Sequence, residues 1–182
     1  MKLLALAASY REHSLNRALL DIAAAIAKDA GAQVTMLDYP KLEAPIYRGE
    51  AVVDTLPEPL EAFSLLLRGH DGMILATPEY NWSIPGGLKN IIDWLSVDSR
   101  APLNGKTALL MSATPSMRGG FSGLQHLRIP LETLGCFVYP QMIGIGRAQE
   151  QLKGNRLARE SDQQHVQFCV SDFIRTTKAI HA

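Results

Sequence analysis

The chain has 182 residues, of which 47% are hydrophobic and 20% are charged. This balance supports one ordinary globular core and excludes disorder throughout the chain. Its 18 basic residues are matched by 18 acidic ones, so net charge does not draw it toward nucleic acid or an anionic membrane.

The residues that would hold a metal or a disulfide framework are sparse. The two cysteines, Cys136 and Cys169, are too few for such a framework, and we expect both to be buried and reduced. No His, Cys or Asp cluster has metal-ligand spacing. No apolar run approaches the ~20 residues of a membrane span, and the apolar stretch at 1–8 is too short for a secretory signal. We therefore expect a cytoplasmic protein without a metal.

Short apolar runs alternate with helical patterns along the chain. A first strand is expected at 3–8, followed by a helix with apolar residues at helical spacing that stops at Gly31. The segment 38–59 holds four prolines and is expected to be a loop, and Gly154-Asn155 predicts a turn. The remaining strands are expected at 33–37, 73–76, 107–111 and 136–139, and the remaining helices at 60–68, 88–95, 124–134 and around 166–174.

This alternation predicts an α/β fold. Strands that are apolar throughout and separated by helices indicate a parallel sheet covered on both faces. Five strands with right-handed crossovers favour a three-layer sandwich with the strand order 2-1-3-4-5. Because no linker or repeat interrupts the pattern, we expect residues 1–182 to form a single domain.

Ligands of such sheets bind beyond the carboxyl ends of the strands. The loop after the first strand offers hydroxyl, guanidinium and amide groups where a helix begins, a combination that suits a phosphate monoester. Ser14 is equally explained as a helix N-cap. The loop at 77–87 is stiffened by prolines and carries Tyr80 and Trp82, which suit the face or rim of a flat heterocycle or, alternatively, a helix end or subunit contact. The loop at 112–120 is rich in small residues, and Arg118 beside it is either a ligand contact or a solvated cation.

Other nucleotide and hydrolase motifs are absent from the sequence. It contains no GxxxxGK[ST] and no GxGxxG after the first strand, which argues against a P-loop or a dinucleotide-binding Rossmann site. Gly120-Phe121-Ser122-Gly123-Leu124 departs from a nucleophile elbow at its last position.

Two signatures at these loops resemble those of the NAD(P)H-dependent FMN reductases, which include chromate, quinone and azo-dye reductases. Residues 9–16 resemble the S-x-R-x-x-S-x-N signature of this family, and residues 77–95 are similar to its TPEYN…PGxLKNxxDWL stretch. Gly119-Gly120 and the blocks near 127 and 134 resemble a third motif. The sequence differs from the family pattern at Ala8, Ala113 and Ser116.

The resemblance implies a flavodoxin-like fold, FMN as cofactor, and NADPH or NADH as co-substrate. It implies that the FMN phosphate is held by the first loop and the isoalloxazine ring by the other two. The cofactor-binding residues implied are Ser9, Arg11, Ser14, Leu15, Asn16, Pro78, Glu79, Tyr80, Asn81, Ser112 and Ala113. A nicotinamide or substrate pocket is expected at Trp82, Ser116, Arg118, Gly119 and Gly120.

The function implied is an oxidoreductase that passes a hydride from NAD(P)H to flavin and then to an acceptor. Quinones, azo dyes, free flavin and metal oxyanions are the candidate acceptors. No protein side chain is assigned a catalytic role, because the flavin carries the redox chemistry. The resemblance also implies a homodimer or homotetramer, with the helix at 88–95 as a candidate contact. The alternative is an FMN electron carrier or binding module without efficient NAD(P)H turnover.

Overall fold

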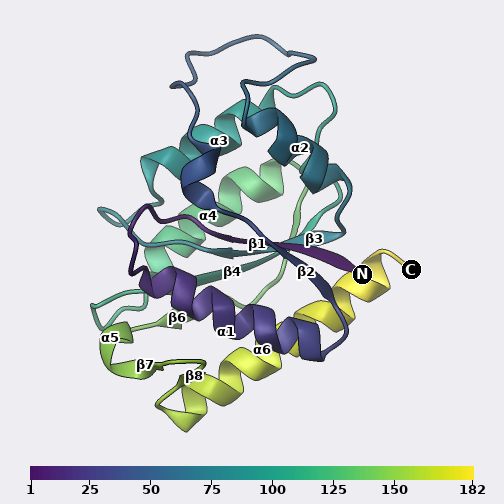
Figure 1. Ribbon diagram of the computed structural model, residues 1–182. Coiled ribbons are helices and arrows are strands. Elements are labelled where there is room, and N and C mark those ends of the chain that lie inside the picture. The colour runs from purple at the N-terminus through teal and green to yellow at the C-terminus, as the bar shows by residue number, and fades with distance from the viewer.

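A computed structural model describes residues 1–182, and it places a parallel sheet between two layers of helices (Figure 1). The strand order is β2-β1-β3-β4-β5, with a further strand, β6, paired to β4. The order 2-1-3-4-5 expected from the sequence is therefore confirmed. The strands are β1 (Lys2–Ala7), β2 (Gln33–Met36), β3 (Gly72–Ala76), β4 (Thr107–Ala113), β5 (Phe137–Val138) and β6 (Ile143–Ile145).

The helices divide between the two faces of the sheet. In Figure 1, α1 and α6 lie below the sheet, whereas α2, α3 and α4 lie above it. Each layer packs against the sheet around its own apolar core. The core under α1 and α6 has 25 buried residues, and the core under α2, α3 and α4 has 24. No helix combines the length and the apolar character that crossing a bilayer requires. The helices are α1 (Leu15–Asp29), α2 (Leu60–Arg68), α3 (Gly86–Ser96), α4 (Phe121–Thr133) and α6 (Glu160–Ile180).

Strand β4 explains why two cores exist. All seven of its residues are buried, and successive side chains point to opposite faces of the sheet. Leu109 belongs to the core under α1 and α6, whereas Leu110 belongs to the core under α2, α3 and α4. A continuous apolar run is therefore the pattern that a central parallel strand requires.

The fifth strand differs from the prediction at 136–139. It is split into β5, which pairs with Thr107 and Ala108, and β6, which pairs with Met111 to Ala113. Between the two pieces, Pro140 has no N–H to donate to a ladder. The Arg128 guanidinium also donates to the carbonyl oxygen of Tyr139 at 2.9 Å, which ends the regular pairing.

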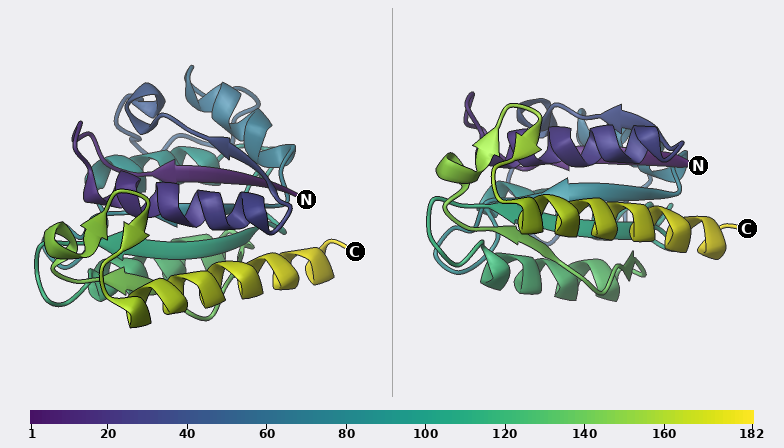
Figure 2. Two further views of the ribbon diagram at one scale, coloured as in Figure 1. Left: turned by 60° about the horizontal axis from the view of Figure 1, so that its bottom comes forward. Right: turned by 90° about the horizontal axis from the view of Figure 1, so that it is seen from below.

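Besides β6, four short elements were not predicted from the sequence. They are the 3-10 helix η1 (Tyr39–Leu42), helix α5 (Ala148–Gln151) and strands β7 (Leu152–Lys153) and β8 (Arg156–Leu157). The turn expected at Gly154-Asn155 is confirmed and joins β7 to β8 as an antiparallel hairpin. In Figure 2 both chain ends lie at the end of the sheet where β1 begins, and α5 lies at the opposite end, where the strands finish.

A buried ion network anchors the connection that follows α3. The Asp98 carboxylate is 4% exposed and accepts two hydrogen bonds from the Arg100 guanidinium, at 2.7 and 2.9 Å, one from the Arg100 backbone N–H at 3.0 Å, and one from the Ser64 hydroxyl of α2. Arg100 also pairs with Glu61. Backbone hydrogen bonds of Val53 attach the long loop before α2 to the same segment. This network fixes α2 against α3.

Candidate flavin site

A cavity of about 320 Å³ lies where the strands end. Its lining comes from the loops after β1, β3 and β4, from the last residue of β4, from the first turn of α1 and from α5. All the residues expected to bind cofactor line it, except Asn81 and Ser112. The lining residues are Ser9, Arg11, His13, Ser14, Leu15, Asn16, Pro78, Glu79, Tyr80, Ala113, Thr114, Pro115 and Gln149.

The first loop presents hydrogen-bond donors to this cavity. Helix α1 begins at Leu15, and the Ser14 oxygen accepts a hydrogen bond from the backbone N–H of Arg17 at 3.2 Å. Ser14 is thus the N-cap, and its hydroxyl proton remains free to be donated. Arg11 is exposed and forms no ion pair within the chain. Donors at the positive end of a helix favour an anion.

Asn16 lines the cavity and also joins two of the elements that form it. Its side-chain Nδ2 donates to the carbonyl oxygen of Ala113 at 3.1 Å, and its Oδ1 accepts from the Ala113 N–H at 2.9 Å. The side chain is buried, and this pair joins the start of α1 to the end of β4. Asn16 therefore fixes the relative position of two loops around the cavity.

The loop after β3 folds into a two-residue hairpin. Tyr80 and Ser83 exchange backbone hydrogen bonds of 2.9 and 3.0 Å. The two residues between them, Asn81 and Trp82, have φ of 49° and 66°, the signature of a type I′ turn. Tyr80 lines the cavity, whereas Asn81, at the tip of the turn, does not.

Trp82 and Arg118 form a pair outside the cavity. Trp82 is 55% exposed, and the Arg118 guanidinium lies 4.4 Å from the centre of its ring. The contact connects the hairpin after β3 to the loop after β4. It creates a flat, cationic surface beside the cavity.

Ser112 does not reach the cavity. It is fully buried, and its hydroxyl has no hydrogen-bond partner. A Cβ added to Gly120 would lie 2.2 Å from that hydroxyl, so Ser112 faces the start of α4. The strand continues two residues beyond the predicted end, and the alternation of side chains then turns Ser112 away from α1.

Three of the residues expected around the nicotinamide also lie outside the cavity. Gly119 and Gly120 are buried, with φ of 66° and 75°. A Cβ on Gly119 would lie 2.8 Å from the backbone of Gly144. The Ser116 carbonyl accepts a hydrogen bond from the Arg147 N–H at 2.8 Å. Gly119 therefore permits close packing against β6, and Gly120 permits close packing against Ser112 of β4.

Sequence analysis missed four lining residues. His13 lies inside the first signature, and Thr114 and Pro115 lie in the loop after β4. All three would have been predicted if every residue of these loops had been counted as a candidate. Gln149 belongs to α5, which the sequence pattern did not predict, and nothing in that pattern singles it out.

Neither cysteine contributes a nucleophile. Both are buried and free, as the sequence predicts. Burial raises the pKa of Cys136 to about 12 and that of Cys169 to about 11, so both thiols stay protonated at neutral pH. The nitrogens of His165 are 3.7 and 3.8 Å from the Cys169 sulfur.

The donor chemistry of the cavity fits FMN. The end formed by Ser9, Arg11 and Ser14 offers a cation and hydroxyl groups to a dianion. The one carboxylate in the lining, Glu79, already accepts a hydrogen bond from the Gly123 N–H at 2.8 Å. The opposite end has the proline and tyrosine surface that suits a flat ring.

Comparison with known proteins places the chain in a family. Residues 1–150 match the NADPH-dependent FMN reductase family. The chain is 35% identical over 150 residues to a quinone reductase of Escherichia coli, an alignment covering 79% of this chain and 77% of that protein. It is 32% identical over 175 residues to an NAD(P)H-dependent FMN reductase of Pseudomonas aeruginosa, covering 92% of each.

Solved structures support the fold. The NAD(P)H:(acceptor) oxidoreductase FerB of Paracoccus denitrificans has a TM-score of 0.84 at 23% identity, covering 98% of this chain and 97% of that one. An archaeal flavodoxin has a TM-score of 0.66 at 10% identity, covering 98% and 99%. The fold is flavodoxin-like, as expected. The chain belongs to the NADPH-dependent FMN reductase family, whose members are oxidoreductases with FMN as cofactor and NAD(P)H as electron donor.

Proposed function

We propose that this chain reduces small quinones with electrons from NAD(P)H, using FMN held in the 320 Å³ cavity. Azo dyes, free flavin and metal oxyanions are further candidate acceptors. The observation that carries the proposal is the cluster of anion-binding groups, Ser9, Arg11 and Ser14, where α1 begins. Relatives named quinone reductase and NAD(P)H:quinone oxidoreductase support the choice of acceptor.

The residues of the cavity form two groups, one that binds the phosphate and one that lines the ring. Ser9, Arg11 and Ser14 bind the phosphate, while Pro78 and Tyr80 line the isoalloxazine ring. When bound, the flavin accepts a hydride from the nicotinamide and passes reducing equivalents on. The protein positions the ring and supplies the electrostatic environment. Residues 1–182 act as one FMN-binding domain in this proposal.

The stacked pair of Trp82 and Arg118 forms the nicotinamide side of the site. Its flat face suits an aromatic ring, and the guanidinium suits the phosphates of a dinucleotide. The pair lies at the exposed rim beside the cavity, where a diffusible substrate has access. It takes over the role expected of Gly119 and Gly120.

A steady-state assay tests the function. The purified protein, loaded with FMN, is mixed with NADPH and a soluble benzoquinone, and oxidation is followed at 340 nm. Continuous oxidation that depends on both FMN and the quinone supports the proposal. No turnover with NADPH or NADH and several quinones would contradict it and favour an electron carrier.

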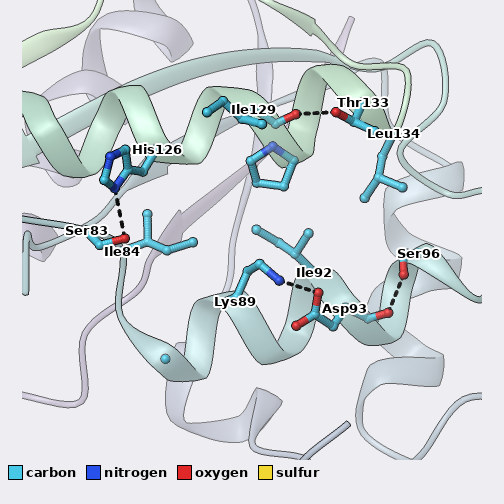
Figure 3. Close-up of a pocket in the computed structure, with 12 residues that line it drawn as sticks. Ser83, Ile84, Lys89, Ile92, Asp93, Ser96, His126, Ile129, Thr133 and Leu134 are labelled. Carbon is cyan, nitrogen blue, oxygen red and sulfur yellow. Dashed lines mark hydrogen bonds and ion pairs between the residues drawn. The ribbon is translucent and has the colours of Figure 1, made fainter. Parts of the chain in front are cut away.

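The chain also acts as a homodimer in this proposal, through the groove between α3 and α4. The groove has a volume of about 600 Å³, and Ile92 and Ile129 lie on its opposite walls (Figure 3). Ile129 is 65% exposed, and exposed apolar surface of this kind marks interaction sites. A second copy fits because α3 is the helix that the family resemblance implies as a contact. A tetramer would need a second interface.

Light scattering after gel filtration tests the dimer. Ile129→Asp places a charge in the groove and is expected to give a monomer. Phe168→Asp, at a side chain of α6 that is 56% exposed, is the control and should leave the dimer intact. A wild-type monomer at micromolar concentration, or an Ile129→Asp dimer, would contradict this interface.

A cytoplasmic location completes the proposal. Two observations support this location. The electron donor of the family, NAD(P)H, is a metabolite of the cell interior, and both cysteines are free thiols. Cell fractionation with antibody detection tests it. Recovery in an extracellular or periplasmic fraction would contradict it.

A further inference from the structure

We propose that the first turn of α4 clamps the hairpin that lines the flavin ring, and that Glu79 is the positioning residue of this clamp. The inference rests on the proposed function, because it assumes that the ring lies against Pro78 and Tyr80. It assigns to Glu79 a task other than contact with the flavin or transfer of a proton.

The first contact of the clamp joins Glu79 to the N-terminus of α4. Gly120, the N-cap residue of this helix, has no side chain to cap the free N–H groups. Glu79 Oε2 accepts a hydrogen bond from the backbone N–H of Gly123 at 2.8 Å, across a sequence separation of 44 residues. A carboxylate at the positive end of a helix is favourable. Glu79 is therefore a cap supplied from another loop.

The second contact lies one turn further along α4. His126 Nδ1 is 3.1 Å from the hydroxyl oxygen of Ser83, within hydrogen-bond distance. Glu79 precedes the hairpin, and Ser83 ends it. The two contacts thus hold the hairpin at both ends against one face of the helix.

Gly123 makes the close approach possible. It is buried, and a Cβ added there would lie 3.1 Å from the carbonyl oxygen of Ser83 and 3.3 Å from Cβ of Glu79. These distances are tighter than ordinary van der Waals contact, so a larger residue would push the hairpin away from α4. The backbone of the hairpin therefore lies directly on the helix.

The α4 side of the clamp lies outside the cavity, whereas the hairpin side contributes to the cavity lining. Glu79 and Tyr80 line the cavity, whereas Gly123 and His126 do not. Changes in α4 therefore alter the position of the ring wall without removing any group that touches the flavin. The bond to Gly123 directs the Glu79 carboxylate toward the helix.

The test compares Glu79→Ala, Glu79→Gln and Gly123→Ala by titrating the full-length apoprotein with FMN and with riboflavin. Glu79→Ala removes the cap and is expected to weaken binding of both flavins about 10-fold, the effect of one charge-assisted hydrogen bond. The ratio of the two Kd values should not change, because riboflavin lacks only the phosphate. Glu79→Gln keeps an acceptor oxygen and should bind both flavins within about 3-fold of wild type.

Gly123→Ala provides the second, independent variant. Residue 123 does not contact the flavin in this proposal. The substitution should nevertheless weaken the binding of both FMN and riboflavin and shift the visible absorption band of bound FMN. The matched control is Gln125→Ala, at an exposed position on the same helix, which should behave as wild type. Circular dichroism of each apoprotein identifies variants that are folded at the titration temperature.

Two results would overturn the clamp. One is wild-type affinity for both flavins in folded Glu79→Ala and Gly123→Ala. The other is a loss confined to FMN, since it would place Glu79 at the phosphate. Failure of the proposed function appears differently, as a wild-type protein that does not bind FMN.

Discussion

The side chain of Asn16 and the backbone of Ala113 bond to each other in both directions, at 3.1 and 2.9 Å. The pair ties the first turn of α1 to the last residue of β4. It is buried, and Ala113 lies two residues beyond Met111, where the pairing of β4 with β3 ends. The shape of the cavity at this point therefore depends on the side-chain amide of Asn16.

Asn16→Ala is expected to lower the free energy of unfolding of the apoprotein by about 2–4 kcal/mol. The change leaves a buried donor and a buried acceptor of Ala113 without partners. Urea denaturation without FMN measures the loss. The neighbouring exposed Arg17→Ala removes only a surface pair with Asp21 and should cost less than about 1 kcal/mol. Equal stability of the two variants would show that the Asn16 bonds are not important for folding.

The Asp98 network predicts an acid-dependent stability. Burial would raise the pKa of Asp98, but the hydrogen bonds from Arg100 and Ser64 outweigh it, and the pKa lies below its usual range. The carboxylate therefore stabilises the fold above the ordinary Asp value of about 3.9. This contribution is lost as the pH falls through the lowered native pKa.

Denaturation at several pH values tests this dependence. Below about pH 4 the stability of the wild type should fall with pH more steeply than that of Asp98→Asn. Asp29→Asn, at an exposed aspartate, should follow the wild type. Parallel curves for wild type and Asp98→Asn would mean that the network does not control acid stability.

Arg118→Ala is expected to raise the KM for NADPH about 5- to 10-fold while leaving kcat and the Kd for FMN unchanged. The guanidinium stacks on Trp82 beside the cavity and outside its lining. Steady-state kinetics at saturating quinone give both constants. Arg48→Ala, in the loop before α2, is the control. A weaker affinity for FMN in Arg118→Ala would instead place this arginine against the flavin.

The sequence predicted most of the framework because burial and local pattern agree there. Strand β3 is apolar throughout, and α2 has the bounds expected from its pattern, 60–68. The elements it missed, η1, β6, α5 and the β7–β8 hairpin, are two to four residues long. Their conformation depends on tertiary contacts, such as the pairing of β6 with the end of β4, that no local pattern encodes.

The site was predicted at the level of loops more reliably than at the level of side chains. Nearly all the residues that the resemblance implies for cofactor binding line one cavity. It did not predict the direction of Ser112, because the strand was expected to end at Met111, or that of Asn81, because the type I′ turn carries it outward. Gln149 lies on an element that only the folded chain brings to the cavity.

The account depends on the phosphate site at the start of α1, and one titration tests it most directly. Apoprotein of the wild type and of Arg11→Ala is titrated with FMN and with riboflavin while flavin fluorescence is recorded. Arg11→Ala should weaken FMN binding by about 1.5–3 kcal/mol and leave riboflavin binding unchanged. An unchanged Kd for FMN in the variant would contradict the phosphate site and the cofactor orientation that follows from it.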